Sequence, residues 1–190
     1  MNNNYFPPQF YIREGRRMIN KDFVFTQNTA VNNAMYDFNS KNQSIGLGSY
    51  NFDTHNVQRF ACPTYKSCHS RPSGSENSGC TDIDNCPYAW NEGDVQINPG
   101  HPYEIPYMIL TPTKNEINNL LVPVGISSSH IGFATLRMEP QWMIMGEAAG
   151  TAANILIKNG NQNNVQGINL GELKQALLKQ GAYLTPQLVE

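Results

Sequence analysis

Two polar side chains separated by a single residue, Asp53 and His55, could carry acid–base chemistry. They fall in residues 44–55, where apolar and polar residues alternate as in a β-strand. Alternation would place both on one strand face, so that the carboxylate orients or charges the imidazole. A histidine that titrates near neutral pH can remove a substrate proton. A surface or purely structural histidine fits the same pattern equally well.

Three arginines near the start of the chain form a second candidate group. Arg13, Arg16 and Arg17 surround Glu14. A guanidinium can bind a carboxylate through two parallel hydrogen bonds, so Arg13 is a candidate for holding a carboxylate substrate. The competing interpretation is an ion-paired strand on the surface.

The most informative segment is a helix that we predict over residues 138–160. Small residues recur on one of its faces at helical spacing, namely Gly146, Ala149, Gly150 and Ala153. Each helical glycine costs about 1 kcal/mol relative to alanine, so two of them require a reason. One reason is close packing against a sheet, without any ligand. The other is close approach of a flat or phosphorylated ligand to the bare start of the helix.

The residues before this helix favour a ligand. Residues 119–125 read as a strand that ends in Gly125, with a buried parallel strand expected at 120–124. A polar loop follows at 126–130, and Arg137 stands just before the helix, where it could neutralise a negatively charged cofactor. Open α/β sheets bind cofactors at such a junction of strand, loop and helix.

Weaker patterns predict the other elements. Residues 11–21 alternate between two faces, and residues 22–25 and 103–110 are β-prone segments. A helix is predicted at 170–181, with Leu173, Leu177 and Leu178 on one face. Residues 62–100 show no period, and we expect 56–100 to be a peripheral insertion.

All four cysteines lie in that expected insertion. Cys62, Cys68, Cys80 and Cys86 are spaced more widely than the short turns of common zinc knuckles. Two disulfides, four free thiols or, less simply, a metal site all fit this spacing. We assign no metal ligands.

Composition excludes several classes of function. The chain has 190 residues and a net charge of −2, which argues against nucleic acid as a partner. No apolar run approaches the roughly 18 residues of a membrane helix, so we expect a soluble protein with no membrane partner. The polar, proline-bearing start is unlike a secretory signal, and the compartment stays open.

Six segments, taken in order, resemble the C-terminal part of a family of FAD-dependent oxidoreductases of the two-dinucleotide-binding type. The segments are 11–19, 44–55, 103–107, 119–130, 137–153 and 170–183. Together they cover most of the chain apart from the cysteine-bearing stretch.

The resemblance implies an α/β fold that combines the C-terminal portion of a Rossmann-like FAD-binding domain with part of a β-rich substrate domain. It assigns residues 1–100 to the substrate side, 101–165 to the FAD-binding domain and 166–190 to a C-terminal helix. It also implies FAD as cofactor and hydride transfer between flavin and a small substrate. The implied cofactor-binding residues are Gly125, Ser127, His130, Arg137, Gly146, Glu147, Ala148, Ala149 and Gly150.

One departure from the family pattern concerns the phosphates of FAD. The strand–G-x-G-x-x-G–helix unit that holds the ADP half is missing, and Gly46-Leu47-Gly48 lacks the third glycine. We therefore expect a fragment whose partner is the missing N-terminal segment of the FAD domain, and weak or no FAD binding by this chain alone. The alternatives are a non-catalytic remnant and a cysteine-stapled or metal-binding interaction module.

Overall fold

The computed structural model describes residues 15, 17–38, 41–55, 58–61, 89–92, 94–160 and 164–186. This part of the chain begins with short helices, continues through strands that form small antiparallel sheets, and ends with the longer helices, which confirms the mixed α/β class. The helices are α1 (Gln27–Val31), α2 (Asn33–Tyr36), α4 (His130–Leu136), α5 (Glu139–Lys158) and α6 (Leu170–Lys179), with 3-10 turns η1 (Tyr107–Leu110) and η2 (Val165–Gly167). The strands are β1 (Ser44–Gly48), β2 (Phe52–Asp53), β3 (Gln58–Ala61), β4 (Ala89–Glu92), β5 (Gln96–Ile97) and β6 (Tyr103–Pro106).

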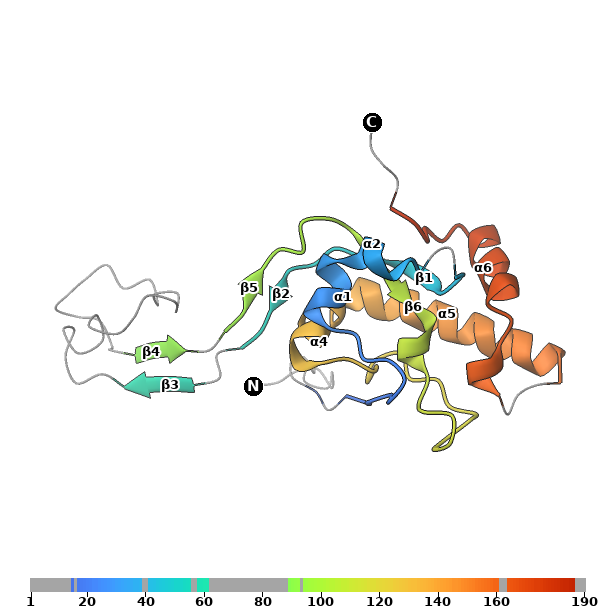
Figure 1. Cartoon of the computed structure of the whole chain (residues 1–190), viewed down its shortest axis with the longest axis horizontal. Coiled ribbons are helices and arrows are strands. Elements are labelled where there is room, and N and C mark those ends of the chain that lie inside the picture. Colours follow the sequence, from blue (N-terminus) through green and yellow to red (C-terminus); the bar gives the residue numbers. More distant parts are fainter. Residues whose placement is uncertain are drawn as a thin grey trace, which may run out of the picture.

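The strands form three separate two-stranded antiparallel sheets, β1–β6, β2–β5 and β3–β4. The last two follow one another along a narrow ribbon that extends away from the helices (Figure 1). Two predictions were therefore wrong in detail. Residues 44–55 form two strands rather than one, and the period-free stretch 62–100 contains the strands Ala89–Glu92 and Gln96–Ile97. The ribbon is held together by hydrogen bonds between backbone groups, which the pattern of side chains in the sequence does not reveal.

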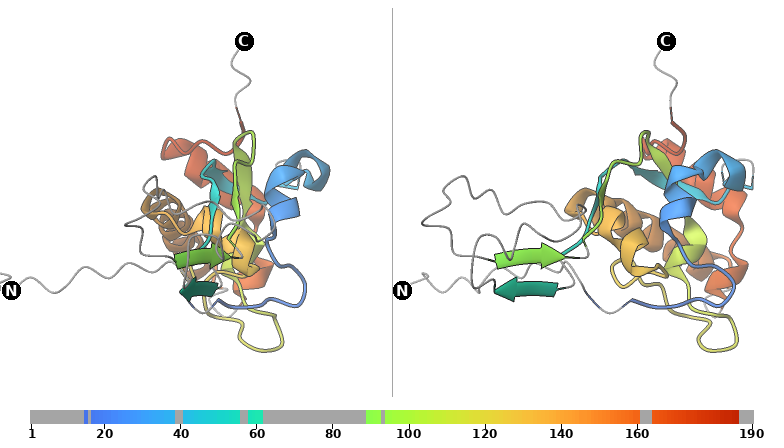
Figure 2. Two further views of the ribbon diagram at one scale, coloured as in Figure 1. Left: turned by 90° about the vertical axis from the view of Figure 1, so that its left-hand side faces the viewer. Right: turned by 60° about the vertical axis from the view of Figure 1, so that its left-hand side comes forward.

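The long helix α5 is the centre of the packed body, with β1 crossing it and α6 lying against its C-terminal half (Figures 1 and 2). The crossing is close because β1 contributes Gly46, where an added Cβ would overlap Cγ2 of Ile144. Ile45, Ile105 and Met145 are fully buried around this contact. A glycine on the strand, rather than one on the helix, thus allows the two elements to approach.

Both helix predictions near the C-terminus are confirmed. The longer helix begins after the N-cap Met138 and ends before Gly160, whose φ of 67° suits a residue just beyond a helix. In α6, Leu173 and Leu177 are buried as predicted, but Leu178 is 45% exposed.

The strand predicted at 120–124 is absent from the described structure. This segment is irregular, Leu120 and Val124 are 40% and 36% exposed, and Val122 N donates to the carbonyl oxygen of Leu110. A parallel strand requires neighbouring strands, and no strand of the described residues lies beside it. The apolar run instead lies at the surface.

The stretch predicted to be β-like at 11–21 contributes only an isolated bridge between Asn20 and Phe23 within its described residues. The prediction for 103–110 holds for β6, after which the chain turns into η1. Among the described helices, none is both long enough and apolar enough to cross a membrane.

Candidate functional site

The two glycines of α5 face open space. A Cβ added at Gly146 or at Gly150 would meet no atom within 4 Å beyond the local helix backbone and chain neighbours. Gly150 is exposed and Gly146 is half-buried. Neither glycine therefore serves packing within the described chain, which removes the simplest explanation for their presence.

The position of these glycines corrects one part of the sequence interpretation. Helix α5 begins at Glu139, so Gly146 lies about two turns inside it and not at its start. Backbone N–H groups at that depth are bonded within the helix, and so they are not available to hold phosphate. What the glycines provide is a flat, side-chain-free surface.

Large apolar side chains stand at both ends of this surface. Met143 is 73% exposed and Ile157 is 67% exposed, and both lie on the same side of α5 as the glycines. We call the strip formed by Met143, Gly146, Gly150, Ala153 and Ile157 the glycine face. Of the other implied cofactor residues on α5, Glu147 is exposed, whereas Ala148 and Ala149 point into the core.

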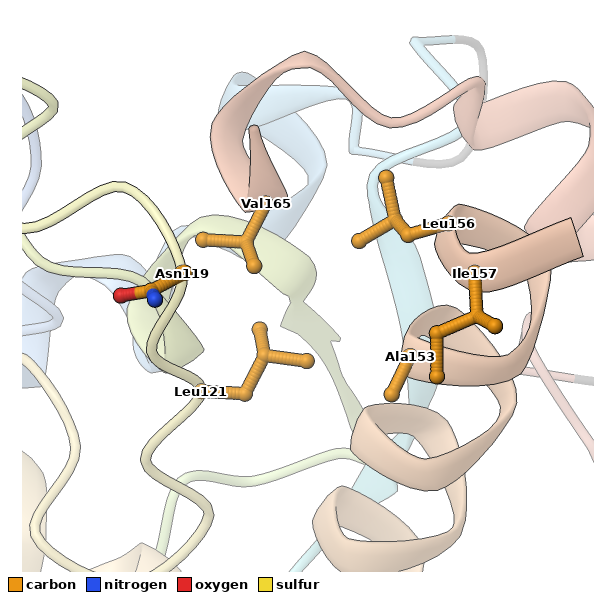
Figure 3. A pocket seen from close by; sticks show the side chains of 6 residues that line it. All are labelled: Asn119, Leu121, Ala153, Leu156, Ile157 and Val165. Carbon is orange, nitrogen blue, oxygen red and sulfur yellow. The ribbon is translucent and has the colours of Figure 1, made fainter. Parts of the chain in front are cut away.

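A cavity of about 250 Å³ continues the glycine face toward the C-terminal end of the helix (Figure 3). Its lining is almost entirely apolar and comes from α5, from the irregular segment before Gly125 and from η2: Asn119, Leu121, Ala153, Leu156, Ile157 and Val165. The apolar run that fails to form a strand thus forms one wall of this hollow.

Asp53 is bound to a buried arginine. Arg137 donates from Nη2 to Asp53 Oδ2 at 2.7 Å and to the Asp53 carbonyl oxygen at 3.2 Å, and the arginine side chain is 0% exposed. Gln96 Nε2 donates to the other carboxylate oxygen at 2.6 Å. The strand β2 ends at Asp53, so the exposed His55 lies beyond it and the predicted common strand face does not extend that far.

Arg137 lies just before α5, as expected, but its surroundings are protein. It is the C-cap of α4, its guanidinium carbon is 5.9 Å from the centroid of the Tyr50 ring, and its Nη1 lies 3.7 Å from Met138 Sδ. The positive charge of Arg137, which we expected to neutralise a cofactor, is thus paired with the carboxylate of Asp53.

The serine-rich loop before α4 is buried and not open. Ser127 Oγ donates to the Phe23 carbonyl oxygen at 2.7 Å and accepts from Asn20 N at 2.8 Å. The carbonyl oxygen of Gly125 accepts from Met18 N at 2.9 Å, and exposed His130 opens α4. This loop therefore joins the N-terminal described residues to the body.

Other candidates lie outside the described residues. Arg13, Arg16 and all four cysteines belong to this group, whereas Arg17 lies over the Phe133 ring at 5.4 Å. In the part of the chain that the structure describes, no cluster of three or more histidine, cysteine, aspartate or glutamate residues could hold a metal.

The site thus combines a long helix that has a flat open face with an adjoining apolar hollow. The family model described as FAD dependent oxidoreductase matches residues 2–177, and the chain belongs to this family. Searches of the curated proteins and of the solved structures return no significant match. Family membership makes the chain part of a flavin-dependent class of oxidoreductases and implies FAD as the cofactor.

Sequence reasoning missed the apolar wall made by Leu121 and the surroundings of Arg137. The run at 120–124 carried a signal for apolar contact, but its periodicity could not show whether it is buried in a sheet or lines a hollow. The partner of Arg137 comes from a residue 84 positions away, and no local pattern marks such a pair.

Proposed function

We propose that this protein acts in hydride transfer between a small substrate and FAD, and that the flavin ring lies on the glycine face of α5. The observation that carries the proposal is the open space at Gly146 and Gly150. Together the two glycines cost the helix about 2 kcal/mol relative to alanine. A flat ring that packs against the backbone is a physical reason to keep them.

The dimensions and polarity of the neighbouring hollow support the same assignment. The isoalloxazine system has a flat aromatic body, which suits a bare helical surface that continues into an apolar cavity of about 250 Å³. When bound, FAD would supply the two-electron chemistry, and the protein would supply orientation and exclusion of water.

The residues proposed for the substrate side are His55 and Arg13. His55 is exposed beyond β2, where it could take a proton as hydride leaves the substrate. Arg13 would pair with a substrate carboxylate. Asp53 is better assigned to Arg137 than to orienting His55, because its carboxylate lies 2.7 Å from Nη2 of that arginine.

The ADP half of FAD requires groups that the glycine face does not provide, since its backbone N–H groups are used within the helix. We propose that a separate segment of the FAD domain binds the pyrophosphate. On this view the chain recognises the flavin ring itself, so FAD, flavin mononucleotide and riboflavin should bind with affinities within a few-fold of one another.

Titration of the 190-residue chain with these three flavins, followed by the flavin absorption spectrum, tests the proposal. Weak, saturable changes of similar affinity for all three would support recognition of the ring. No change with any flavin at millimolar concentration would contradict it and would favour a non-catalytic module. Binding of FAD alone would place recognition at the ADP half.

A further inference from the structure

The dipeptide at the C-terminal end of α5 has the composition of a site that can modify itself. Asn159 is the one asparagine of the sequence that is followed by a glycine, Gly160. The main-chain nitrogen after an asparagine can attack the amide carbon of the asparagine side chain, and a glycine has no Cβ to obstruct the attack. This step is therefore the asparagine site of the chain that forms a five-membered succinimide ring most readily.

The end of the helix leaves this dipeptide room to react. Asn159 is the C-cap of α5, both residues are exposed, and a Cβ added at Gly160 would meet no atom within 4 Å beyond its chain neighbours. The Gly160 N–H donates to the Ile157 carbonyl oxygen at 3.1 Å, so this bond must open before the nitrogen can attack. Because helix ends fray, opening here is easier than in the middle of α5.

A hydrogen bond between helices restrains the reacting side chain. Asn159 Nδ2 donates to Glu172 Oε2 at 3.0 Å, and Nδ2 is the atom that would leave as ammonia. Glu172 lies in the first turn of α6, where its N–H donates to the side-chain oxygen of the N-cap Asn169 at 3.1 Å. The acceptor is thus anchored in α6, and the amide of Asn159 loses this bond when it turns toward Gly160.

We propose that Asn159–Gly160 is a site of spontaneous deamidation and that the hydrogen bond to Glu172 slows the reaction. The nitrogen of Gly160 forms a bond to Cγ of Asn159, the bond from Cγ to Nδ2 breaks, and Nδ2 leaves as ammonia with the proton of the Gly160 N–H. Water then adds to one of the two ring carbonyl carbons and opens the ring. The products are aspartate and isoaspartate, in which the main chain runs through the former side chain.

The aspartate product weakens the contact between α5 and α6. The donor to Glu172 is lost, and a second carboxylate takes its place opposite the first. The new charge also lies at the C-terminal end of α5, where the helix dipole disfavours an anion. For Asn159→Asp we expect an equilibrium constant for folding about threefold lower, the effect of a like-charge pair at a helix end.

Incubation of the full chain at mildly alkaline pH, followed by peptide mass spectrometry, tests the proposal. We expect replacement of the amide NH₂ by OH to build up at Asn159, about fivefold faster in Glu172→Ala, the effect of losing one net hydrogen bond. Glu172→Gln keeps an acceptor and should stay close to the wild-type rate. The matched control Gln175→Ala, at an exposed position of the same helix, should not change the rate.

Urea unfolding checks that each variant keeps its fold and also measures the effect of Asn159→Asp. In the Glu172→Gln background this substitution should cost less, because the glutamine amide can donate to the new carboxylate. An unmodified Asn159 after prolonged incubation would overturn the proposal. So would equal deamidation rates in wild type and Glu172→Ala, since the hydrogen bond would then have no influence. No flavin enters this test, so its result is independent of the flavin proposal.

Discussion

Among the residues that the structure describes, Arg137 is the largest side chain that is fully buried, and Asp53 on another element carries the matching charge. Removing one partner of such a pair is far more harmful than replacing both, because a lone buried charge has lost its hydration without compensation. The pair also has a local consequence, since it holds β2 against the junction between α4 and α5.

We predict that Asp53→Asn lowers the free energy of unfolding by about 3 kcal/mol, because the guanidinium stays buried without its counter-charge. The double variant Asp53→Leu with Arg137→Met should lose clearly less. Urea denaturation of the wild type and both variants measures this. Equal losses for the two would contradict the expectation that an unpaired buried charge causes most of the loss.

Two buried phenols make the stability sensitive to alkaline pH. Burial raises the pKa of Tyr103, an effect that its hydrogen bond to Thr135 partly offsets, and burial likewise raises the pKa of Tyr107. In the unfolded chain both titrate near about 10. Because the folded state binds their protons more tightly, their contribution is complete below pH of about 10 and is lost as pH rises above it.

Urea midpoints measured from pH 8 to 11.5 should therefore fall above pH of about 10. The fall should be shallower in Tyr107→Phe, which has no proton to lose at this position. That variant should also lose some stability at every pH, since the Tyr107 hydroxyl donates to the Val165 carbonyl oxygen at 3.0 Å. An identical pH dependence in variant and wild type would count against this explanation.

At the scale of elements, two glycines that the sequence alone does not distinguish have opposite roles. Gly46 on β1 allows α5 to approach, whereas Gly146 on α5 faces open space. We predict that Gly46→Ala lowers the free energy of unfolding by about 1–3 kcal/mol through overpacking against the stiff Ile144 side chain. Gly146→Ala should raise it by up to about 1 kcal/mol. Thermal or urea unfolding measures the stability of both variants. A loss of stability in Gly146→Ala would show that the glycine face is packed against protein.

The elements that the sequence predicted well are those whose signals are local. Helix α5 has a bounded apolar pattern and Gly160 beyond its end, and α6 has the same kind of stripe in Leu173 and Leu177. The strand expected at 120–124 failed because a parallel strand depends on neighbours distant in sequence. The ribbon strands were missed because antiparallel pairing over two to four residues leaves no period to detect.

The candidate site was predicted in the same uneven way. The small residues of α5 identified the glycine face, but only the structure shows that no described atom lies within 4 Å of a Cβ added at Gly146 or Gly150. The partner of Arg137 lies far away in sequence, and the hollow beside Leu121 forms only when the body is folded.

At the scale of the whole molecule, the proposed roles separate catalysis from cofactor binding. In the FAD-loaded protein, His55→Ala should slow substrate-driven bleaching of the flavin by a factor of about 10² to 10⁴, the usual effect of losing a general base. The flavin content should be unchanged, because His55 is not part of the glycine face and lies in an exposed position beyond β2. Normal bleaching would remove His55 from catalysis, and loss of flavin would make its role structural.

The most direct test of the account is flavin binding by Gly146→Val, compared with Gln175→Val at an exposed position of the neighbouring helix α6. Both variants place a β-branched side chain in a helix, but only the first fills the open space of the glycine face. In a riboflavin titration followed by the flavin absorption spectrum, the account predicts saturable binding in wild type and Gln175→Val, and its loss in folded Gly146→Val. Equal riboflavin affinity in all three proteins would contradict the assignment of this face to the flavin.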